Sequence, residues 1–298
     1  MNERYRHYRD INGILLLDKP LHLTSNLALQ KVKHLVCARK AGHTGSLDPL
    51  ATGMLPICFG EATKFSQYLL NADKAYQVTA QLGSKTTTSD AEGEVIATAS
   101  VPEYSTAQIE AVLDQFRGPI MQVPSMYSAL KHQGQPLYRL ARQGVEVERQ
   151  ARPVTIYELK LLAQTADTLE LEVRCSKGTY IRNLVEDIGE SLGCFAHVSA
   201  LRRLYVDPFE HAPMLTLDEI NADTKVLAVE EALRALPVIR LASASAFFIK
   251  NGQAIQVEAP EYEGVVTLYD DHGSFLGVGD CFKDGRIMPK RLLKKVTS

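Results

Sequence analysis

The segment GHTGSLDPLATG, residues 42–53, combines chemical groups that an ordinary loop does not need together. Its glycines allow tight turns, and His43, Asp48 and the hydroxyl side chains of Thr44 and Ser46 are among the residues between them. A carboxylate held in a rigid turn can act as a covalent nucleophile when a nearby cation keeps it ionised. Arg182 is one candidate for that cation. The sequence therefore predicts a catalytic site at Asp48 but does not specify a substrate.

The same residues fit other interpretations. Asp48 followed by Pro49 is a common start of a helix, with the aspartate as N-cap, so DPLATGMLP could begin a short helix. A P-loop requires Gly-Lys-Ser/Thr after its glycines, and a dinucleotide site requires GxGxxG after a strand; neither pattern is present. His43 and Asp48 alone are too few ligands for a metal site. The helix-capping interpretation stays open beside the catalytic one.

Regular elements are predicted around this segment. Residues 13–20, GILLLDKP, form an apolar run stopped by proline, which predicts a buried strand. Residues 75–84 alternate between polar and apolar side chains, which predicts a half-buried strand with Tyr76 on its inner face. Residues 179–193 repeat apolar side chains at helical spacing and end at a glycine. The candidate cation Arg182 therefore lies near the start of a predicted helix.

Two further regions differ in composition from the rest of the chain. Residues 119–152 are rich in proline, glycine, tyrosine and arginine, and predict an exposed, partly irregular insertion with one short helix starting near Pro136. After residue 237 the chain changes to short strands and glycine turns. We therefore expect a large domain of residues 1–237 and a small β-rich domain of residues 238–298.

The composition fits a soluble globular protein, with 45% hydrophobic and 23% charged residues in a chain of 298. No apolar run is long enough for a membrane helix, and the charged N-terminus lacks the apolar core of a signal peptide. The five cysteines are scattered and form no CxxC pair, which favours reduced thiols. We expect a cytoplasmic protein that does not act at a membrane.

Charge is unevenly distributed along the chain. The net charge of −2 does not by itself point to nucleic acid. Residues 283–298, however, contain six basic side chains and one acidic one, and residues 174–182 contain three basic side chains and no acidic one. Such clusters fit an RNA-binding surface, but they also occur as solvated faces of other proteins.

Several motifs, in order along the chain, resemble the TruB family, the tRNA pseudouridine-55 synthases. GHTGSLDPLATGMLP resembles the motif around the family's nucleophilic aspartate, and GILLLDKPLHLTSN resembles its opening Lys-Pro motif. KAYQVTAQLGSKTTTSDAEGE resembles its tyrosine-bearing strand, and CSKGTYIRNLVEDIGESLG its arginine motif. The resemblance covers about residues 11–210, with a departure at Ser125, where some members have a second proline. The C-terminal part resembles the PUA-like RNA-binding domain of bacterial members.

This resemblance implies an α+β fold: a pseudouridine-synthase catalytic domain with a mixed, largely antiparallel sheet flanked by helices, and a small β-barrel-like PUA domain. It implies isomerisation of a flipped-out uridine at position 55 in the T arm of tRNA, without a cofactor or a metal. The insertion at about residues 119–152 is expected to grip the T arm, and residues 238–298 to reach the acceptor stem. A monomer is expected.

The resemblance also implies roles for individual residues. Asp48 is implied as the nucleophile, which attacks either uracil C6 or ribose C1′. Tyr76 is expected to stack on the uracil and help remove a proton, and Arg182 to pair with Asp48. His43, Tyr180 and Leu201 are expected to contact the substrate region, and contacts to tRNA are expected from Lys19, Lys131, Arg139, Arg142 and Arg202. Taken one at a time, these residues also have ordinary structural roles. The histidine can cap a turn, the aromatic and aliphatic residues can be buried in strands, and the cations can be solvated.

Two rival functions use some of the same features. A non-catalytic RNA-binding or folding factor would use the same basic surfaces and would not need Asp48; tRNA folding is also conceivable as an added activity. A hydrolase or phosphotransferase acting through Asp48 would need a metal, and no second acidic motif at suitable spacing is present. The tRNA-uridine isomerase is the function that the sequence favours.

Overall fold

The computed structural model describes residues 8–128, 130–258 and 261–294 of the chain. The α-helices in these ranges are α1 (Ser25–Leu35), α2 (Ser66–Asn71), α3 (Thr106–Leu113), α4 (Leu137–Arg142), α5 (Ile181–Leu192) and α6 (Ser243–Lys250). The strands are β1 (Gly13–Lys19), β2 (Ala41–His43), β3 (Ala51–Phe59), β4 (Lys74–Leu82), β5 (Ser84–Thr86), β6 (Val95–Thr98), β7 (Gly118–Gln122), β8 (Lys131–His132), β9 (Gln135–Pro136), β10 (Arg152–Gln164), β11 (Thr168–Cys175), β12 (Ala196–Val206), β13 (Val238–Leu241), β14 (Ile255–Gln256), β15 (Gly264–Asp270), β16 (Phe275–Cys281) and β17 (Arg286–Leu292). Short 3₁₀ helices cover Gly60–Phe65, Asp114–Phe116, Leu217–Glu219 and Val229–Leu233.

The large domain is built on one sheet with the strand order β1-β3-β12-β4-β11-β10-β7, and β2 pairs with β3 outside this path. β12 runs parallel to β3, and the other neighbours in this sheet are antiparallel. The predicted mixed, largely antiparallel sheet is therefore confirmed. The long strand β12 lies between the strand that follows Asp48 and the strand that carries Tyr76, so it brings two distant parts of the sequence together.

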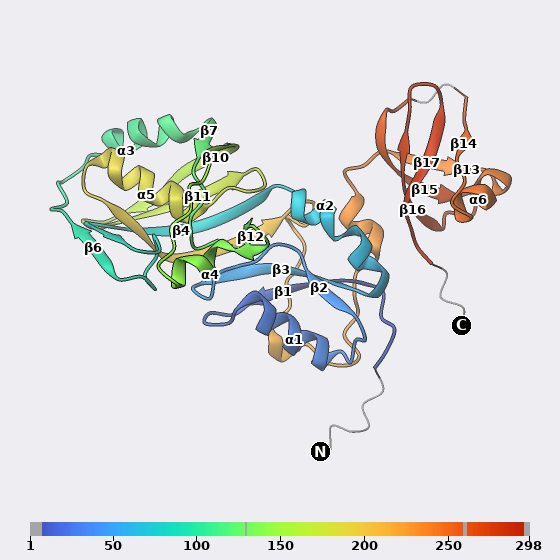
Figure 1. Cartoon of the computed structure of the whole chain (residues 1–298), viewed down its shortest axis with the longest axis horizontal. Coiled ribbons are helices and arrows are strands. Elements are labelled where there is room, and N and C mark those ends of the chain that lie inside the picture. The colour runs from blue at the N-terminus through green and yellow to red at the C-terminus, as the bar shows by residue number, and fades with distance from the viewer. Residues whose placement is uncertain (1–7, 129, 259–260, 295–298) are drawn as a thin grey trace, which may run out of the picture.

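Helices cover the sheet as Figure 1 shows, with α3 and α5 over the part formed by β4, β10 and β11, and α1 beside β1, β2 and β3. One apolar core joins these helices to the strands. α5 buries Leu184, Val185 and Ile188, and Gly193 ends it in the left-handed conformation with φ 80°. The predicted helix is thus confirmed. Because its apolar side packs against the core, the orientation of its first turn, which carries Arg182, is fixed.

The C-terminal part forms a separate five-stranded sheet with the order β13-β15-β16-β17-β14, and α6 packs on it around its own apolar core. This curled sheet matches the predicted β-barrel-like domain (Figure 1). β13 begins at Val238, and the exact domain boundary stays a prediction. The two sheets are joined by the segment around Glu61: the rings of Phe65 and Phe275 lie 5.8 Å apart, and Lys294 N donates to Glu61 Oε2 at 2.8 Å.

One local prediction was wrong. The segment DPLATGMLP does not begin a helix: Pro49 and Leu50 form a turn, and Ala51 starts β3. β3 pairs antiparallel with β1 over seven residues, from Lys19 opposite Gly53 to Gly13 opposite Phe59. This long-range pairing outweighs the local preference of Asp-Pro for a helix start. Asp48 is therefore not a helix N-cap, which removes the simplest structural explanation of its presence.

The segment predicted as a partly irregular insertion begins with a regular strand. Its first residues belong to β7, which pairs with β10 in the main sheet, so the irregular part begins at Val123. The short helix expected near Pro136 is present as α4, with Pro136 at its N-cap. Among the described residues, no helix is both long and apolar enough to span a membrane.

Candidate active site

Asp48 lies in a turn that α1 and the sheet hold from both sides. The buried Ser25, at the start of α1, donates through Oγ to Leu47 O at 2.9 Å and accepts from Leu47 N at 2.7 Å. On the other side, Ala51 N donates to Asp48 O at 3.0 Å as β3 begins. The backbone of Leu47 and the carbonyl of Asp48 are thus both held by hydrogen bonds, which restricts where the Asp48 carboxylate can point.

Arg182 binds Asp48 directly. Its Nε lies 3.1 Å from Asp48 Oδ2, and its Nη1 lies 3.1 Å from Asp90 Oδ2. Two further donors reach backbone carbonyls, with Nη1 3.0 Å from Thr88 O and Nη2 2.9 Å from Tyr127 O. Arg182 is only 6% exposed and Asp90 only 2%. The planar guanidinium is therefore held between two carboxylates and two carbonyls, and one edge is presented to Asp48.

The environment of Asp48 changes its acidity. Its side chain keeps 41% of its surface exposed. The surrounding protein nevertheless removes enough water to raise the pKa of Asp48 above its ordinary value of 3.8, while Arg182 opposes this shift and the nearby Asp90 adds to it. Burial therefore opposes ionisation of Asp48, and the bound guanidinium favours it. An ionised carboxylate that has lost part of its hydration is a better nucleophile than a fully hydrated carboxylate.

The strand pairing of β12 brings Tyr76 and Leu201 to the same place. Leu201 pairs with Ala51 of β3 and with Val78 of β4, which places it beside the start of β3 and two residues from Tyr76. Leu201 is 8% exposed. Burial raises the pKa of Tyr76, and the positive charge of Arg203 opposes this shift. Tyr76 therefore keeps its phenolic proton at neutral pH beside an aliphatic neighbour.

Two cations lie fully buried near Asp48. Arg203 is 1% exposed, and it donates through Nε to Met54 O at 2.7 Å and through Nη2 to Gly45 O at 3.2 Å. Lys19 is 0% exposed, and its Nζ donates to Leu23 O at 2.7 Å. Burial lowers the pKa of Lys19 to about 8, with Asp48 opposing the shift. Arg203 thus anchors the glycine turn, and Lys19 adds positive charge near the carboxylate.

Gly53→Ala is expected to disrupt this anchoring. Gly53 has φ +96°, and a Cβ there would lie 2.2 Å from the carbonyl oxygen of Arg203, so the backbones of β3 and β12 would have to separate. We expect a loss of about 3 kcal/mol or more in the free energy of unfolding, measured by urea denaturation. The matched control is Gly193→Ala, where φ is +80° but nothing lies within 4 Å; strain alone predicts about 1–2 kcal/mol there. Equal losses in the two variants would contradict the close approach of the strands.

His43 and Tyr180 lie on two elements that adjoin the Asp48 turn and Arg182 in the sequence. His43 ends β2, and burial, followed by the charge of Arg203, lowers its pKa, so the imidazole is neutral at neutral pH. Its Nδ1 is buried without a hydrogen-bond partner among the described residues. Tyr180 is the N-cap residue of α5, two positions before Arg182. Its backbone is held by the buried Gln122, which accepts from Tyr180 N at 3.0 Å and donates to Tyr180 O at 3.3 Å.

The residues predicted to contact tRNA fall into three groups. Lys131, Arg139 and Arg142 are exposed on the insertion, and no ion pair involves them within the described ranges. Arg202 instead makes a two-pronged ion pair with Asp18 at 2.9 and 2.8 Å. Lys19 is buried, and its amine donates to the backbone carbonyls of Pro20 and Leu23.

The basic C-terminal segment is less positive than its sequence indicates. Lys283, Arg286 and Lys290 lie within 4.0 Å of carboxylates of Glu263, Asp284 and Asp280 respectively. Each of these acids is exposed in part, so water screens the pairs. Lys295, the last cation of the segment, lies outside the described residues.

Sequence reasoning missed two residues of the site. Asp90 lies in TSDAEGEV, which reads as a plain turn, yet its carboxylate is buried against Arg182. Arg203 is the second residue that the sequence analysis does not name; it follows Arg202 directly on β12. Alternation along β12 is the signal that could have found it, because Leu201 and Arg203 lie on the same face of the strand and Arg202 on the other. Among the described residues, no group of three or more His, Cys, Asp or Glu side chains could hold a metal ion.

Three family models together match residues 33–293 of this chain. Residues 33–181 match the family model described as "TruB family pseudouridylate synthase (N terminal domain)", residues 182–237 match "tRNA pseudouridylate synthase B C-terminal domain", and residues 237–293 match "Pseudouridine synthase II TruB, C-terminal". The chain is 54% identical over 303 residues to a tRNA pseudouridine synthase B of Aeromonas salmonicida, covering 96% of this chain and 95% of that protein. It is 55% identical over 297 residues to one of Pseudomonas fluorescens, covering 96% and 97%.

Solved structures support the fold. A chain from a Cbf5–Nop10–Gar1 complex superposes with a TM-score of 0.73 at 24% identity, covering 95% of this chain and 84% of that chain. At that identity the likeness concerns the fold, which is the predicted α+β arrangement with a PUA-like second domain. The family model extends across the Asp48 turn to the start of α5, and the close relatives span nearly the whole chain. The chain belongs to the TruB family of pseudouridylate synthases.

Proposed function

We propose that this enzyme converts uridine to pseudouridine at position 55 in the T arm of tRNA, with Asp48 as the nucleophile. The observation that carries the proposal is the ion pair of 3.1 Å between Asp48 and a buried arginine, in a turn that leads into β3, where Ala51 pairs with Leu201. Relatives that share 54% and 55% of its residues are named tRNA pseudouridine synthases, which supports tRNA as the substrate.

The reaction breaks the N1–C1′ bond of uridine and forms a C5–C1′ bond after the ring has turned. The C5 hydrogen leaves as a proton and N1 gains one, so no atoms are added overall. The Asp48 carboxylate attacks either C6 of the uracil or C1′ of the ribose, and leaves again when the product forms. Because a stacked base hides both atoms, the uridine must be extruded from the T loop before attack.

The surrounding residues supply the walls of the base site. We assign stacking against the uracil to Tyr76 and an aliphatic contact to Leu201, while Tyr180 and His43 border the nucleotide. A phenol that retains its proton cannot accept the C5 proton in the resting enzyme, so the raised pKa of Tyr76 favours stacking as its role. Arg182 keeps Asp48 ionised and oriented, and Asp90 positions Arg182.

The remaining surfaces are assigned to tRNA binding. The insertion, with its unpaired Lys131, Arg139 and Arg142, is expected to hold the T arm through the phosphates. The PUA-like domain is expected to reach the acceptor stem. Its electrostatic contribution to tRNA binding should be smaller than that of the insertion, because three of its cations are paired with acids. We propose that the enzyme acts as a monomer in the cytoplasm, where its five free cysteines would stay reduced.

The pH dependence of the rate follows from Asp48. The nucleophile must be ionised, and burial raises its pKa above the ordinary value of 3.8. We expect the single-turnover rate to fall as the pH falls through this raised pKa, and to stay level above it. The check is a pH profile with circular dichroism at each point. A rate that stays constant down to about pH 4, with the fold intact, would contradict the assignment.

The test of the proposed function is to map the modified position. An unmodified tRNA transcript would be incubated with the enzyme, treated with a carbodiimide that marks pseudouridine, and read by reverse transcription. A single stop at position 55, absent from a transcript with cytidine there, is the expected result. Binding of tRNA without any stop would overturn the enzyme assignment and favour the RNA-folding factor. Stops only outside the T arm would overturn the assigned position.

A further inference from the structure

The loop between β5 and β6 carries Asp90 and is tied down at the aspartate itself. Asp90 Oδ1 accepts from Thr88 Oγ1 at 2.6 Å and from Glu92 N at 3.1 Å. Asp90 Oδ2 lies 3.1 Å from Arg182 Nη1. The backbone on either side of Asp90 pairs with Val198 of β12, at 3.0 and 2.9 Å. The place of the Asp90 carboxylate against Arg182 therefore depends on the backbone of this loop.

Ser89, directly before Asp90, has an unusual backbone and a buried side chain. Its φ is +59°, a left-handed conformation that is uncommon for a residue other than glycine. The residue is 9% exposed, and its Oγ donates to Glu186 Oε2 of α5. The other carboxylate oxygen of Glu186 lies 2.9 Å from Lys85 Nζ. Glu186 thus holds the left-handed turn one residue before Asp90.

Arg182 and Glu186 act on the loop from the same side. Glu186 follows Arg182 by four residues, so the two side chains lie on one face of α5, one turn apart. Glu186 binds Ser89, and Arg182 binds Asp90. Two consecutive residues of the loop are therefore attached to two consecutive turns of one helix.

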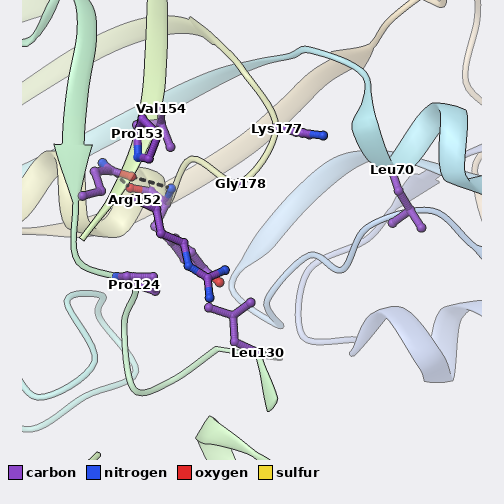
Figure 2. Close-up of a pocket in the computed structure, with 10 residues that line it drawn as sticks. Leu70, Pro124, Leu130, Arg152, Pro153, Val154, Lys177 and Gly178 are labelled. Carbon is purple, nitrogen blue, oxygen red and sulfur yellow. Dashed lines mark hydrogen bonds between the residues drawn. The ribbon is translucent and has the colours of Figure 1, made fainter. Parts of the chain in front are cut away.

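The start of α5 is fixed by a different contact. Tyr180, its N-cap residue, exchanges two hydrogen bonds with the Gln122 side chain, at 3.0 and 3.3 Å. Figure 2 draws these bonds as dashed lines, in the wall of a pocket that Arg152 and Gly178 also line. A change at Glu186 should therefore act on the loop and leave the start of α5 in place.

We propose that Glu186 is a positioning residue for the isomerisation: it holds Ser89, and through Ser89 it fixes the Asp90 carboxylate against Arg182. The proposal rests on the proposed function, because Arg182 in turn orients Asp48. When the loop is released, Asp90 draws away from the guanidinium, and Arg182 interacts with Asp48 alone. A carboxylate that its cation binds more tightly is a weaker nucleophile.

This arrangement predicts a change that a loss of stability alone would not produce. Burial raises the pKa of Asp48, Arg182 and Lys19 lower it, and Asp90 raises it further. With Asp90 displaced, the pKa of Asp48 should fall, so the acid limb of the rate–pH profile should move to lower pH. The rate on the plateau should fall as well, while the affinity for tRNA stays unchanged.

The experiment compares variants of the full chain by single-turnover tritium release from C5-labelled tRNA and by filter binding. Glu186→Ala removes the acceptor of Ser89, and Glu186→Gln keeps an oxygen acceptor. Ser89→Gly keeps the left-handed backbone but removes the hydroxyl. Glu190→Ala is the matched control, because Glu190 lies one turn further along α5 and pairs with the same Lys85, at 2.6 Å. Within the described residues, Glu190 forms no hydrogen bond or ion pair with Ser89.

Glu186→Ala and Ser89→Gly are expected to lower the single-turnover rate about 10- to 30-fold, with tRNA affinity within about twofold of wild type. Both should move the acid limb of the profile to lower pH. Glu186→Gln should retain at least about a third of the rate, and Glu190→Ala at least about half. In the Asp90→Asn background, Glu186→Ala should lower the rate by less than about twofold more, because the residue through which it acts is already altered.

Three results would overturn the proposal. They are equal losses of rate in Glu186→Ala and Glu190→Ala, a further loss of about 10-fold from Glu186→Ala in the Asp90→Asn background, and a lower rate with an unshifted pH profile. Urea denaturation shows whether each variant is folded at the assay temperature. If Glu186→Ala is not, Ser89→Gly carries the same test, because it leaves α5 unchanged.

Failure of the proposed function is distinguishable from failure of this inference. In that case the wild-type enzyme would release no tritium. Hydrogen exchange of the Ala91 and Val198 amides, which tie the loop to β12, would still report on the loop. Exchange that is faster in Glu186→Ala than in Glu190→Ala would support the hold of Glu186 on the loop, and equal exchange in the two variants would overturn it.

Discussion

Asp48→Asn is expected to lose at least about 10⁴-fold in the rate of tritium release from C5-labelled tRNA, while tRNA binding stays within about threefold. Asparagine keeps the size of the side chain and can still accept a hydrogen bond from Arg182. It carries no negative charge and cannot form the covalent bond to the substrate. The loss should therefore appear in kcat alone. Single-turnover kinetics and filter binding measure the two quantities separately.

The stability of the same variant provides a second readout. The pKa of Asp48 is raised in the folded protein, so folding disfavours its ionised form, and the stability that this group contributes falls as the pH rises through that pKa. Removing the charge at neutral pH should leave the melting temperature unchanged or higher. Asp280→Asn, in the second domain, is the matched control and should retain full activity. A variant at position 48 that keeps more than about a tenth of the activity would contradict the role of the nucleophile.

Arg182→Lys is expected to lower kcat by about 10²- to 10³-fold and to destabilise the fold by about 2–4 kcal/mol. A lysine amine has no planar fork, so it cannot reach Asp48, Asp90 and the carbonyl of Tyr127 at the same time. Whichever contact it keeps, a buried carboxylate or carbonyl loses its donor. Single-turnover rates and urea denaturation measure the two effects.

Arg202→Lys is the control for this substitution. Arg202 makes its two-pronged pair with Asp18 where the side chains are 38% and 25% exposed, so water screens it, and less than about 1 kcal/mol should be lost. If Arg182→Lys lost as little rate and as little stability as Arg202→Lys, the bridge that Arg182 forms between Asp48 and Asp90 would contribute to neither. Asp90→Asn separates the roles further, since it should lower kcat about 10-fold or more without weakening RNA binding.

The elements that depend on local pattern were predictable. The alternation over residues 75–84 and the helical spacing over residues 179–193 correspond to β4 and α5, because each presents one apolar face to a single core. Gly193 ends α5 as expected, since its left-handed backbone suits glycine. These elements carry Tyr76 and Arg182, so part of the site followed from periodicity together with the family resemblance.

What depends on distant partners was not predictable. Nothing local shows that residues 51–59 become a strand, because that requires β1 on one side and β12 on the other. The burial of Asp90 follows from a contact with Arg182, 92 residues away in the sequence. Lys19 has the composition of an RNA contact, and only the folded chain places it beneath the surface. Charge in the sequence indicates what a residue can do, whereas burial decides what it can reach.

The account is tested most directly by counting the tritium released from each molecule of an unmodified tRNA transcript that is labelled at C5 of every uridine. C5 loses its hydrogen only when it becomes the new glycosidic carbon. The account predicts that the wild-type enzyme releases the tritium of one uridine per tRNA and none when the T-arm target is replaced by cytidine. Tight, salt-sensitive binding with no release, or release from many uridines regardless of that replacement, would contradict it.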